Sequence, residues 1–131
     1  MGLPKLYPIL DAGLLAARGH DLRWAAEQMR AAGVELLQYR DKSGSPQAIL
    51  QNADVIGEVF AGANCRLILN DRADLAVLAN WGGVHVGQGD LLPEDARRVV
   101  GASRWVGVST HNEKQVRLAD ASCADYVAVG P

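Results

Sequence analysis

Short apolar runs alternate with longer segments of helical periodicity along the whole chain of 131 residues. The apolar runs have the composition of buried strands, and their starts are roughly 20 to 30 residues apart, as in βα units. We therefore expect six strands, at residues 6–11, 34–39, 66–69, 83–86, 105–108 and 125–129. Because strands joined by helices lie parallel in their sheet, this pattern predicts an α/β fold.

The segments between the strands carry the signals of helices. Asp21 has the position of an N-cap, and Gly33 ends the helix that it starts. The apolar face of that helix consists of Leu22, Ala25, Ala26, Met29 and Ala32. Pro46 opens a second helix, whose apolar stripe runs from Ile49 to Phe60. Three further helices are predicted at residues 72–80, 93–100 and 113–121.

Two architectures fit such a sheet: an open doubly wound sheet and part of a (β/α)8 barrel. A doubly wound nucleotide-binding fold usually has a GxGxxG loop after its first strand, and residues 11–15 have none. Polar residues instead recur at the C-terminal ends of successive strands, as they do in barrels. We therefore expect a single domain over residues 1–131 with the fold of an incomplete TIM barrel. Six strands cannot close an eight-stranded barrel, so we expect the chain to be C-terminally truncated, with an unpaired edge on the sixth strand.

The composition is that of an ordinary globular protein: 49% of residues are hydrophobic, 21% are charged, and the net charge is −2. This balance gives no indication of nucleic acid or of an anionic membrane as a partner. No apolar stretch is long enough to span a bilayer, and no basic segment leads into an apolar run, so we expect no signal peptide.

Cys65 and Cys123 lack metal-binding spacing, and we expect reduced, buried thiols and a cytoplasmic location. The sequence leaves the oligomeric state open.

The second strand ends in the polar segment Gln38-Tyr39-Arg40-Asp41-Lys42. Side chains alternate along a strand, so Gln38, Arg40 and Lys42 share one side if the extended backbone persists. An amide and two cations suit phosphate oxygens, because arginine offers a rigid fork of donors and lysine a point charge. The alternative is a solvated loop in which Arg40 or Lys42 pairs with Asp41.

Carboxylates follow the next two strands. Asp71 comes directly after the third strand, within Asn70-Asp71-Arg72, and Asp90 follows the fourth, within Gly87-Gln88-Gly89-Asp90. Neighbouring strands are about 4.8 Å apart, so both carboxylates can reach a single cation. A few oxygen ligands, completed by water or phosphate, are what Mg²⁺ uses. Taken singly, Asp71 can equally well be the cap of the following helix.

Two further segments contain candidate residues. His85 lies within the fourth strand, and we expect a histidine satisfied in the core rather than a catalytic base, whereas His20 and His111 are expected at the surface. The fifth strand ends in Ser109-Thr110-His111-Asn112, where hydroxyls can donate to a substrate or residues 110–112 can cap the next helix. No third member of a nucleophilic triad is evident.

Five segments together resemble, in their order, the motifs of the thiamine-phosphate synthase family. They are residues 38–42 (Gln-Tyr-Arg-Asp-Lys), 69–72 (Leu-Asn-Asp-Arg), 83–90 (Gly-Val-His-Val-Gly-Gln-Gly-Asp), 107–111 (Gly-Val-Ser-Thr-His) and 125–131 (Asp-Tyr-Val-Ala-Val-Gly-Pro). That family, a group of transferases of thiamine biosynthesis, joins a hydroxymethylpyrimidine diphosphate to a thiazole phosphate and releases diphosphate.

The resemblance implies a role for each matched residue. Binding of the pyrimidine diphosphate falls to Gln38, Tyr39, Arg40, Asp41, Lys42, Asn70 and Ser109, and Asp71 and Asp90 are implied Mg²⁺ ligands. Arg40, Lys42 and Ser109 are the implied catalytic residues, because charge on the leaving diphosphate grows in the transition state of a dissociative substitution. The small-molecule substrates are the only implied partners.

The sequence differs from the family pattern in places, and two alternative interpretations of the chain compete with this one. Gly89 stands where the family often has glutamate, and the loops that hold the thiazole phosphate in the family follow the segment at Gly130-Pro131. We therefore expect little activity from these 131 residues alone. A related thiazole tautomerase shares the fold but generally lacks the Gly-Gln-x-Asp signature and the full Gln-x-Arg-x-Lys, both of which this chain has. A non-catalytic phosphate-binding fragment is the other alternative.

Overall fold

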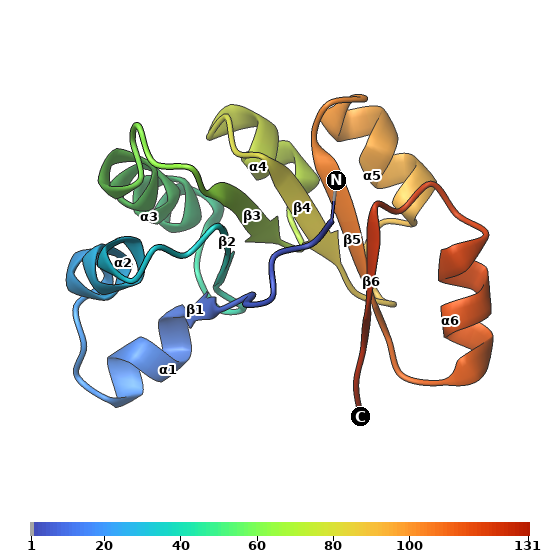
Figure 1. The fold of residues 1–131 in the computed structure, drawn as a ribbon, viewed down its shortest axis with the longest axis horizontal. Helices are drawn as coiled ribbons and strands as arrows, with labels where there is room; N and C mark the ends of the chain where they lie inside the picture. The colour runs from blue at the N-terminus through green and yellow to red at the C-terminus, as the bar shows by residue number, and fades with distance from the viewer. Residues whose placement is uncertain (1) are drawn as a thin grey trace. The chain divides into compact units, whose positions relative to one another are not determined.

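The computed structural model describes residues 2–131 and contains all six predicted strands (Figure 1). They are β1 (Ile9–Asp11), β2 (Leu36–Arg40), β3 (Arg66–Asn70), β4 (Gly83–Val86), β5 (Trp105–Thr110) and β6 (Tyr126–Val129). The helices between them are α1 (Ala12–Ala17), α2 (Leu22–Ala31), α3 (Pro46–Val59), α4 (Ala73–Leu78), α5 (Pro93–Val100) and α6 (Glu113–Asp120). The α/β prediction is confirmed.

Helix α1 was not predicted from the sequence. It has six residues and buries none of them, so it carries no periodic apolar stripe that could reveal it. Its start is fixed by Asp11, whose carboxylate accepts a hydrogen bond from the backbone N–H of Leu14 at 3.0 Å. The first strand is correspondingly shorter than predicted and begins at Ile9 instead of Leu6.

Strand order decides between the two architectures that the sequence left open. The strands are parallel, and their order in the sheet follows the chain from β1 to β6. A doubly wound sheet reverses its order at a switch point, whereas a barrel adds each strand next to the one before it. The observed order is therefore that of a (β/α) barrel segment.

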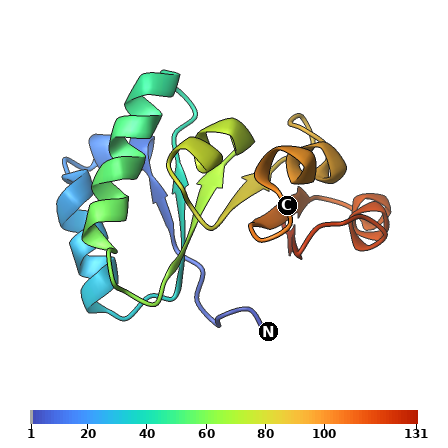
Figure 2. The same ribbon diagram turned by 90° about the horizontal axis from the view of Figure 1, so that it is seen from above.

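The chain divides into two compact units, one up to Leu67 and one from Ile68 to Pro131. In the first unit, α2 and α3 lie side by side on one face of β1 and β2 (Figure 2). Both helices start as the sequence predicts: Asp21 accepts from Trp24 N, and Ser45 accepts from Ala48 N just before Pro46. The core of this unit is formed by Leu10, Ala25, Ala26, Leu36, Leu37, Ile49, Ala53 and Ile56.

In the second unit, α4 lies next to α5, and α6 packs beside β5 and β6. The strands bring fully buried aliphatic side chains together, among them Ile68, Val84, Val86 and Val106. Gly83 is required where β4 approaches β5, because a Cβ atom there would lie 2.5 Å from the backbone oxygen of Trp105. The prediction of one domain over residues 1–131 stays a prediction.

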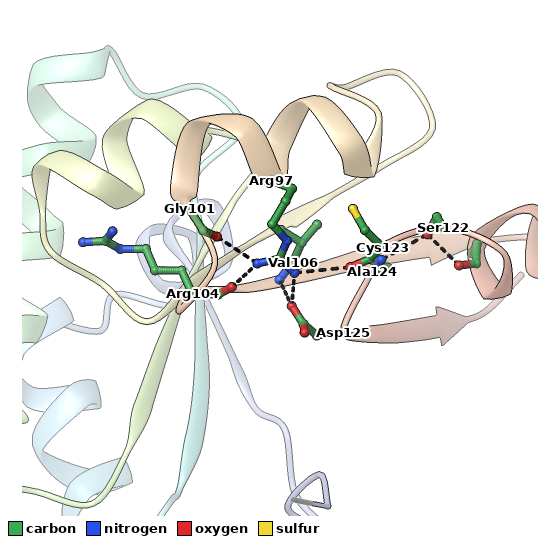
Figure 3. A network of polar contacts seen from close by, with 9 residues as sticks. Arg97, Gly101, Arg104, Val106, Ser122, Cys123, Ala124 and Asp125 are labelled. Carbon is green, nitrogen blue, oxygen red and sulfur yellow. Dashed lines mark hydrogen bonds and ion pairs between the residues drawn. The ribbon is translucent and has the colours of Figure 1, made fainter.

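A hydrogen-bond network centred on Arg97 of α5 ties the loops before β5 and β6 together (Figure 3). The guanidinium donates to three backbone carbonyls and one carboxylate, those of Gly101, Arg104, Cys123 and Asp125. Asp125 also accepts from the N–H of Val106 at 2.7 Å. This network lies at the N-terminal ends of the strands, where residues of a barrel serve stability.

The cysteines correct one prediction. Both are free thiols, as expected, but Cys65 is only partly buried and Cys123 is exposed. Burial and the nearby Glu35 raise the pKa of Cys65 to about 11. Among residues 2–131, no helix combines the length and apolar character needed to cross a membrane.

Candidate substrate and metal site at the strand ends

The predicted site residues fall into two sets, one in each compact unit, both following the C-terminal ends of strands. The first set begins with Gln38, which is buried in β2 and donates from Nε2 to the hydroxyl of Tyr7 at 3.0 Å. Tyr39 is fully buried on the other side of the strand, where its hydroxyl contacts Asn52 of α3 at 2.9 Å. Burial raises the pKa of Tyr39 to about 12, so the phenol stays protonated. The buried Tyr39 side chain therefore joins β2 to α3.

Arg40 at the end of β2 is paired with Asp11 at the end of β1. Their ion pair measures 2.5 Å, and the Arg40 side chain remains 39% exposed. The same Asp11 carboxylate caps α1, and the hydrogen bonds from Leu14 N–H and from Arg40 lower its pKa. A guanidinium has five N–H groups, so one contact with Asp11 leaves it the capacity to bind an anion. The Arg40–Asp41 pair of the alternative interpretation is therefore wrong, whereas its Lys42–Asp41 pair stays a prediction.

Asp41 instead orders the loop after β2. Its carboxylate accepts hydrogen bonds from the backbone N–H groups of Ser43 at 3.2 Å and Gly44 at 2.8 Å. A Cβ atom at Gly44 would lie 2.1 Å from Oδ2 of that carboxylate, so a side chain at this position would displace the carboxylate from the turn. The strand ends at Arg40, and the exposed Lys42 therefore lies in this loop rather than on the alternating face expected from the sequence.

In the second set, Asp71 does not cap the following helix. The N-cap of α4 is Arg72, which makes no side-chain capping bond and pairs with Asp74 at 2.8 Å. Asp71 has a left-handed backbone with φ of 67°, and its N–H donates to the carbonyl of His85 on β4 at 2.8 Å. The capping alternative is wrong, and the carboxylate sits at the end of β3 in a conformation that few residues adopt.

Asp90 closes a tight turn after β4. Its Oδ2 accepts from the N–H of Gly87 at 2.7 Å, and its own N–H donates to the carbonyl of Gly87 at 3.2 Å. Within the same turn, the exposed Gln88 donates to the carbonyl of Ser109 at 2.7 Å. These bonds fix the loop that carries Asp90 against the end of β5.

Asp71 and Asp90 thus follow neighbouring strands, and Asn70 at the end of β3 pairs in register with His85 of β4. Both carboxylates are partly exposed and provide oxygen ligands, the type that Mg²⁺ prefers. Within residues 2–131, no group of three or more His, Cys, Asp or Glu side chains is gathered for a metal. Carboxylate oxygens are of the chemical type that a Mg²⁺ ion takes when water or phosphate completes its shell.

Ser109 on β5 is held by His85, as the core histidine interpretation requires. His85 is 5% exposed, and its Nε2 lies 2.7 Å from Ser109 Oγ while its Nδ1 lies 2.9 Å from the hydroxyl of Tyr126. Burial lowers the pKa of His85 to about 4, so the ring is neutral near pH 7. Thr110 is fully buried and donates to the carbonyl of Ala128, and Asn112 caps α6. His20 and His111 are exposed, as predicted.

Comparison with known proteins gives the family. A family model described as thiamine monophosphate synthase, TMP-TENI, matches residues 6–131. The chain belongs to the thiamine monophosphate synthase family. A "Thiamine-phosphate synthase" of Koribacter versatilis is 47% identical over 131 residues, and one of Xanthobacter autotrophicus is 38% identical over 126 residues. The alignments cover 98% and 96% of this chain.

The chain spans about 60% of the length of these family members: 62% of the Koribacter protein and 59% of the Xanthobacter protein. A solved "Thiamine phosphate pyrophosphorylase" from Pyrococcus furiosus shares its fold with a TM-score of 0.80 at 23% identity. That alignment covers 97% of this chain and 60% of the solved one. The fold prediction, a partial TIM barrel with six parallel strands, is confirmed.

Three contacts that support the family motifs were not predicted from the sequence, although Tyr126 itself belongs to one of the motifs. Tyr7 contacts Gln38, Asp11 holds Arg40, and Tyr126 contacts His85. Each comes from a strand or segment next to the motif in space but distant in sequence, by 31, 29 and 41 positions respectively. The sequence signal for these contacts is position: each of the three residues lies in a strand, or just before one, that is adjacent in the sheet to a strand carrying a motif.

Proposed function

We propose that the protein containing this chain is a thiamine-phosphate synthase. It couples hydroxymethylpyrimidine diphosphate with hydroxyethylthiazole phosphate, releases diphosphate and forms thiamine phosphate, with Mg²⁺ as cofactor. The match of the family model to residues 6–131 carries this proposal. The shared name of the aligned relatives favours a synthase over a tautomerase. The free thiols of Cys65 and Cys123 fit a reducing compartment, and we place the protein in the cytoplasm.

Each set of strand-end residues has a part in this reaction. Arg40 and Lys42 bind the diphosphate, and the ion pair with Asp11 holds the Arg40 guanidinium at the end of β2. Gln38, Asn70 and Ser109 orient the pyrimidine diphosphate. The Asp41 carboxylate accepts from the Tyr39 hydroxyl and from Gly44 N–H, and it thereby orders the loop that receives the substrate. Asp71 and Asp90 would hold the Mg²⁺ ion, which would supply positive charge to offset that of the diphosphate.

The reaction is a dissociative substitution at the methylene carbon of the pyrimidine. Its bond to the diphosphate oxygen breaks, the electron pair leaves with the diphosphate, and the thiazole nitrogen donates a pair to form the new carbon–nitrogen bond. Negative charge grows on the leaving group, so Arg40 and Lys42 stabilise the transition state more than the ground state. This chemistry requires no strong general base, which agrees with a His85 that is buried and neutral.

Substitution of the two carboxylates in the full-length protein tests the metal assignment. We expect Asp71→Asn and Asp90→Asn each to lower kcat/KM by 100-fold or more, on the order expected when a metal ligand is lost. Asp120→Asn, on the exposed end of α6, is the matched control and should keep normal turnover. Normal turnover in both the Asp71 and the Asp90 variants would show that these carboxylates do not bind the metal. Absence of thiamine phosphate from the unsubstituted enzyme would refute the function itself.

A further inference from the structure

Three residues form a row across the second unit: His85 on β4, Gly107 on β5 and Tyr126 on β6. The register pairs His85 with Gly107, and Gly107 with Tyr126. The middle residue has no side chain, so the ring of Tyr126 lies over it, and a Cβ atom at Gly107 would stand 2.0 Å from Tyr126 Cζ. The glycine therefore lets the two outer side chains meet, with ring centroids 5.5 Å apart and the phenol oxygen 2.9 Å from His85 Nδ1.

Ser109 stands two residues beyond Gly107, on the same face of β5. Its hydroxyl lies 2.7 Å from His85 Nε2, and its carbonyl accepts from Gln88 at 2.7 Å. Tyr126 and His85 are buried, whereas Ser109 is partly exposed. A chain of hydrogen bonds thus runs from the core to one hydroxyl at the strand end.

The direction of these hydrogen bonds follows from the chemistry of the three groups. A neutral imidazole has one N–H donor and one nitrogen acceptor, so only one neighbour can donate to it. A phenol is a much stronger acid than an aliphatic hydroxyl, and it is therefore the better donor to the ring nitrogen. With Tyr126 donating to Nδ1, the proton of His85 sits on Nε2 and is donated to Ser109 Oγ. The proton of Ser109 then points to whatever acceptor lies at the strand end.

We propose that His85 and Tyr126 are positioning residues that hold Ser109 as a hydrogen-bond donor to the pyrimidine diphosphate. The identity of that acceptor rests on the proposed function, whereas the direction of the hydrogen bonds is a property of this chain alone. Ser109 touches the substrate, and the other two residues act through it.

The first test reads the tautomer directly. Long-range ¹H–¹⁵N correlation spectra of the ligand-free full-length protein, labelled with ¹⁵N-histidine, distinguish Nε2–H from Nδ1–H. The signals of His85 are assigned by their loss in His85→Gln. We expect the Nε2–H form, and we expect the ¹⁵N signal of the unprotonated Nδ1 to shift in Tyr126→Phe, because that nitrogen then loses its hydrogen-bond donor. An Nδ1–H form in the unsubstituted protein, or an unchanged Nδ1 signal in Tyr126→Phe, overturns the proposal.

The second test is a kinetic double-mutant cycle on the same full-length enzyme. His85→Leu and Tyr126→Phe should raise the KM for the pyrimidine diphosphate or lower its kcat/KM by about tenfold, as for one lost hydrogen bond to a charged group. The KM for the thiazole phosphate should stay unchanged, and His85→Gln, which keeps an N–H donor, should recover part of the loss. In a Ser109→Ala background, His85→Leu should have almost no further effect.

Equal effects of His85→Leu with and without the Ser109 hydroxyl would mean that the histidine is only structural, and the proposal would be wrong. Tyr126→Phe removes a single oxygen atom and guards against a His85→Leu variant that fails to fold. The tautomer measurement needs no turnover, so it decides the proposal even if the enzyme forms no thiamine phosphate. Failure of the proposed function and failure of this inference therefore give different results.

Discussion

Gly107→Ala is expected to destabilise the protein by displacing the ring of Tyr126. The added Cβ atom would stand 2.0 Å from Cζ, 2.4 Å from the hydroxyl oxygen and 2.5 Å from Cε1 of that ring. Carbon atoms in contact are normally about 3.5 to 4.0 Å apart, so the ring or the strand must move by roughly 1.5 Å. Such a shift also breaks the hydrogen bond between Tyr126 and His85.

Three contributions determine the expected loss in the free energy of unfolding of Gly107→Ala. Overpacking a buried site typically costs about 1 to 3 kcal/mol, and the lost hydrogen bond adds about 1 kcal/mol. Gly107 has no positive φ, so alanine fits its backbone and recovers about 0.4 to 1 kcal/mol through the unfolded chain. The net loss in the free energy of unfolding is therefore about 1 to 3.5 kcal/mol.

Urea unfolding of the full-length protein measures this loss, with two companion variants. Gly89→Ala is the control, because its Cβ atom would meet nothing within 4 Å, and we expect a change of about 0.5 kcal/mol or less. Tyr126→Leu removes the ring atoms that clash while keeping an apolar side chain. In that background Gly107→Ala should be neutral or slightly stabilising, which gives a coupling of about 2 to 4 kcal/mol. Equal losses in both backgrounds would refute the idea that Gly107 makes room for Tyr126.

Two further predictions concern the stability of the second unit. Arg97→Met removes the guanidinium that donates to four groups, including the Asp125 carboxylate, and should lower the free energy of unfolding by about 2 to 4 kcal/mol. Arg98→Met, on the same helix, is the control: its side chain is 84% exposed, and urea titrations should show a change of less than about 0.5 kcal/mol. Burial lowers the pKa of His85 from 6.5 to about 4, so the unfolded chain takes up a proton first as pH falls. Stability should then decrease from about pH 6.5 towards pH 4 by up to about 1.4 kcal/mol per pH unit, and His85→Leu should flatten that part of the profile; an unchanged slope would contradict burial of His85 as the cause.

The sequence predicted the elements whose signals are local. Glycine and proline punctuation and the periodicity of the apolar residues located β4 and α5 at their observed bounds. The second strand was predicted at residues 34–39 and observed at Leu36–Arg40. The alternation does not continue to Lys42, because the Asp41 turn that follows the strand depends on bonds to Ser43 and Gly44 that the sequence pattern does not reveal. Residues that act across strands, such as Tyr126, could not be predicted, since their role depends on register and on a neighbour without a side chain.

The motif residues were identified as a group, but their individual partners were not. Arg40 is a strand-end cation, as predicted, yet its carboxylate is Asp11 from the preceding strand and not the adjacent Asp41. Proximity in sequence favoured Asp41, whereas parallel pairing puts Asp11 in register with Arg40. In a parallel sheet the nearest charge to a strand-end residue therefore tends to come from the next strand.

A polar residue after a strand can have a structural role, such as capping a helix, or a functional one, and Asp71 differs from the capping residues of this chain. Asp11, Asp21 and Asn112 each cap a helix, so capping was the natural expectation for Asp71 as well. Only two non-glycine residues among those described have a positive φ, Asp71 and Asn80. Asn80 ends α4, and the backbone bond from Trp81 to Ala76 across it is a common way to close a helix.

No such closure explains Asp71, which begins no helix and still adopts an unfavourable backbone. A strained residue persists only where its surroundings impose the conformation, and such residues concentrate at functional sites. The hydrogen bond from its N–H to the carbonyl of His85 is the constraint that holds it. The same histidine thus holds the backbone of the proposed metal ligand Asp71 and the hydroxyl of Ser109. Its substitution by leucine should therefore disturb mainly Ser109, because only that contact is made through the side chain.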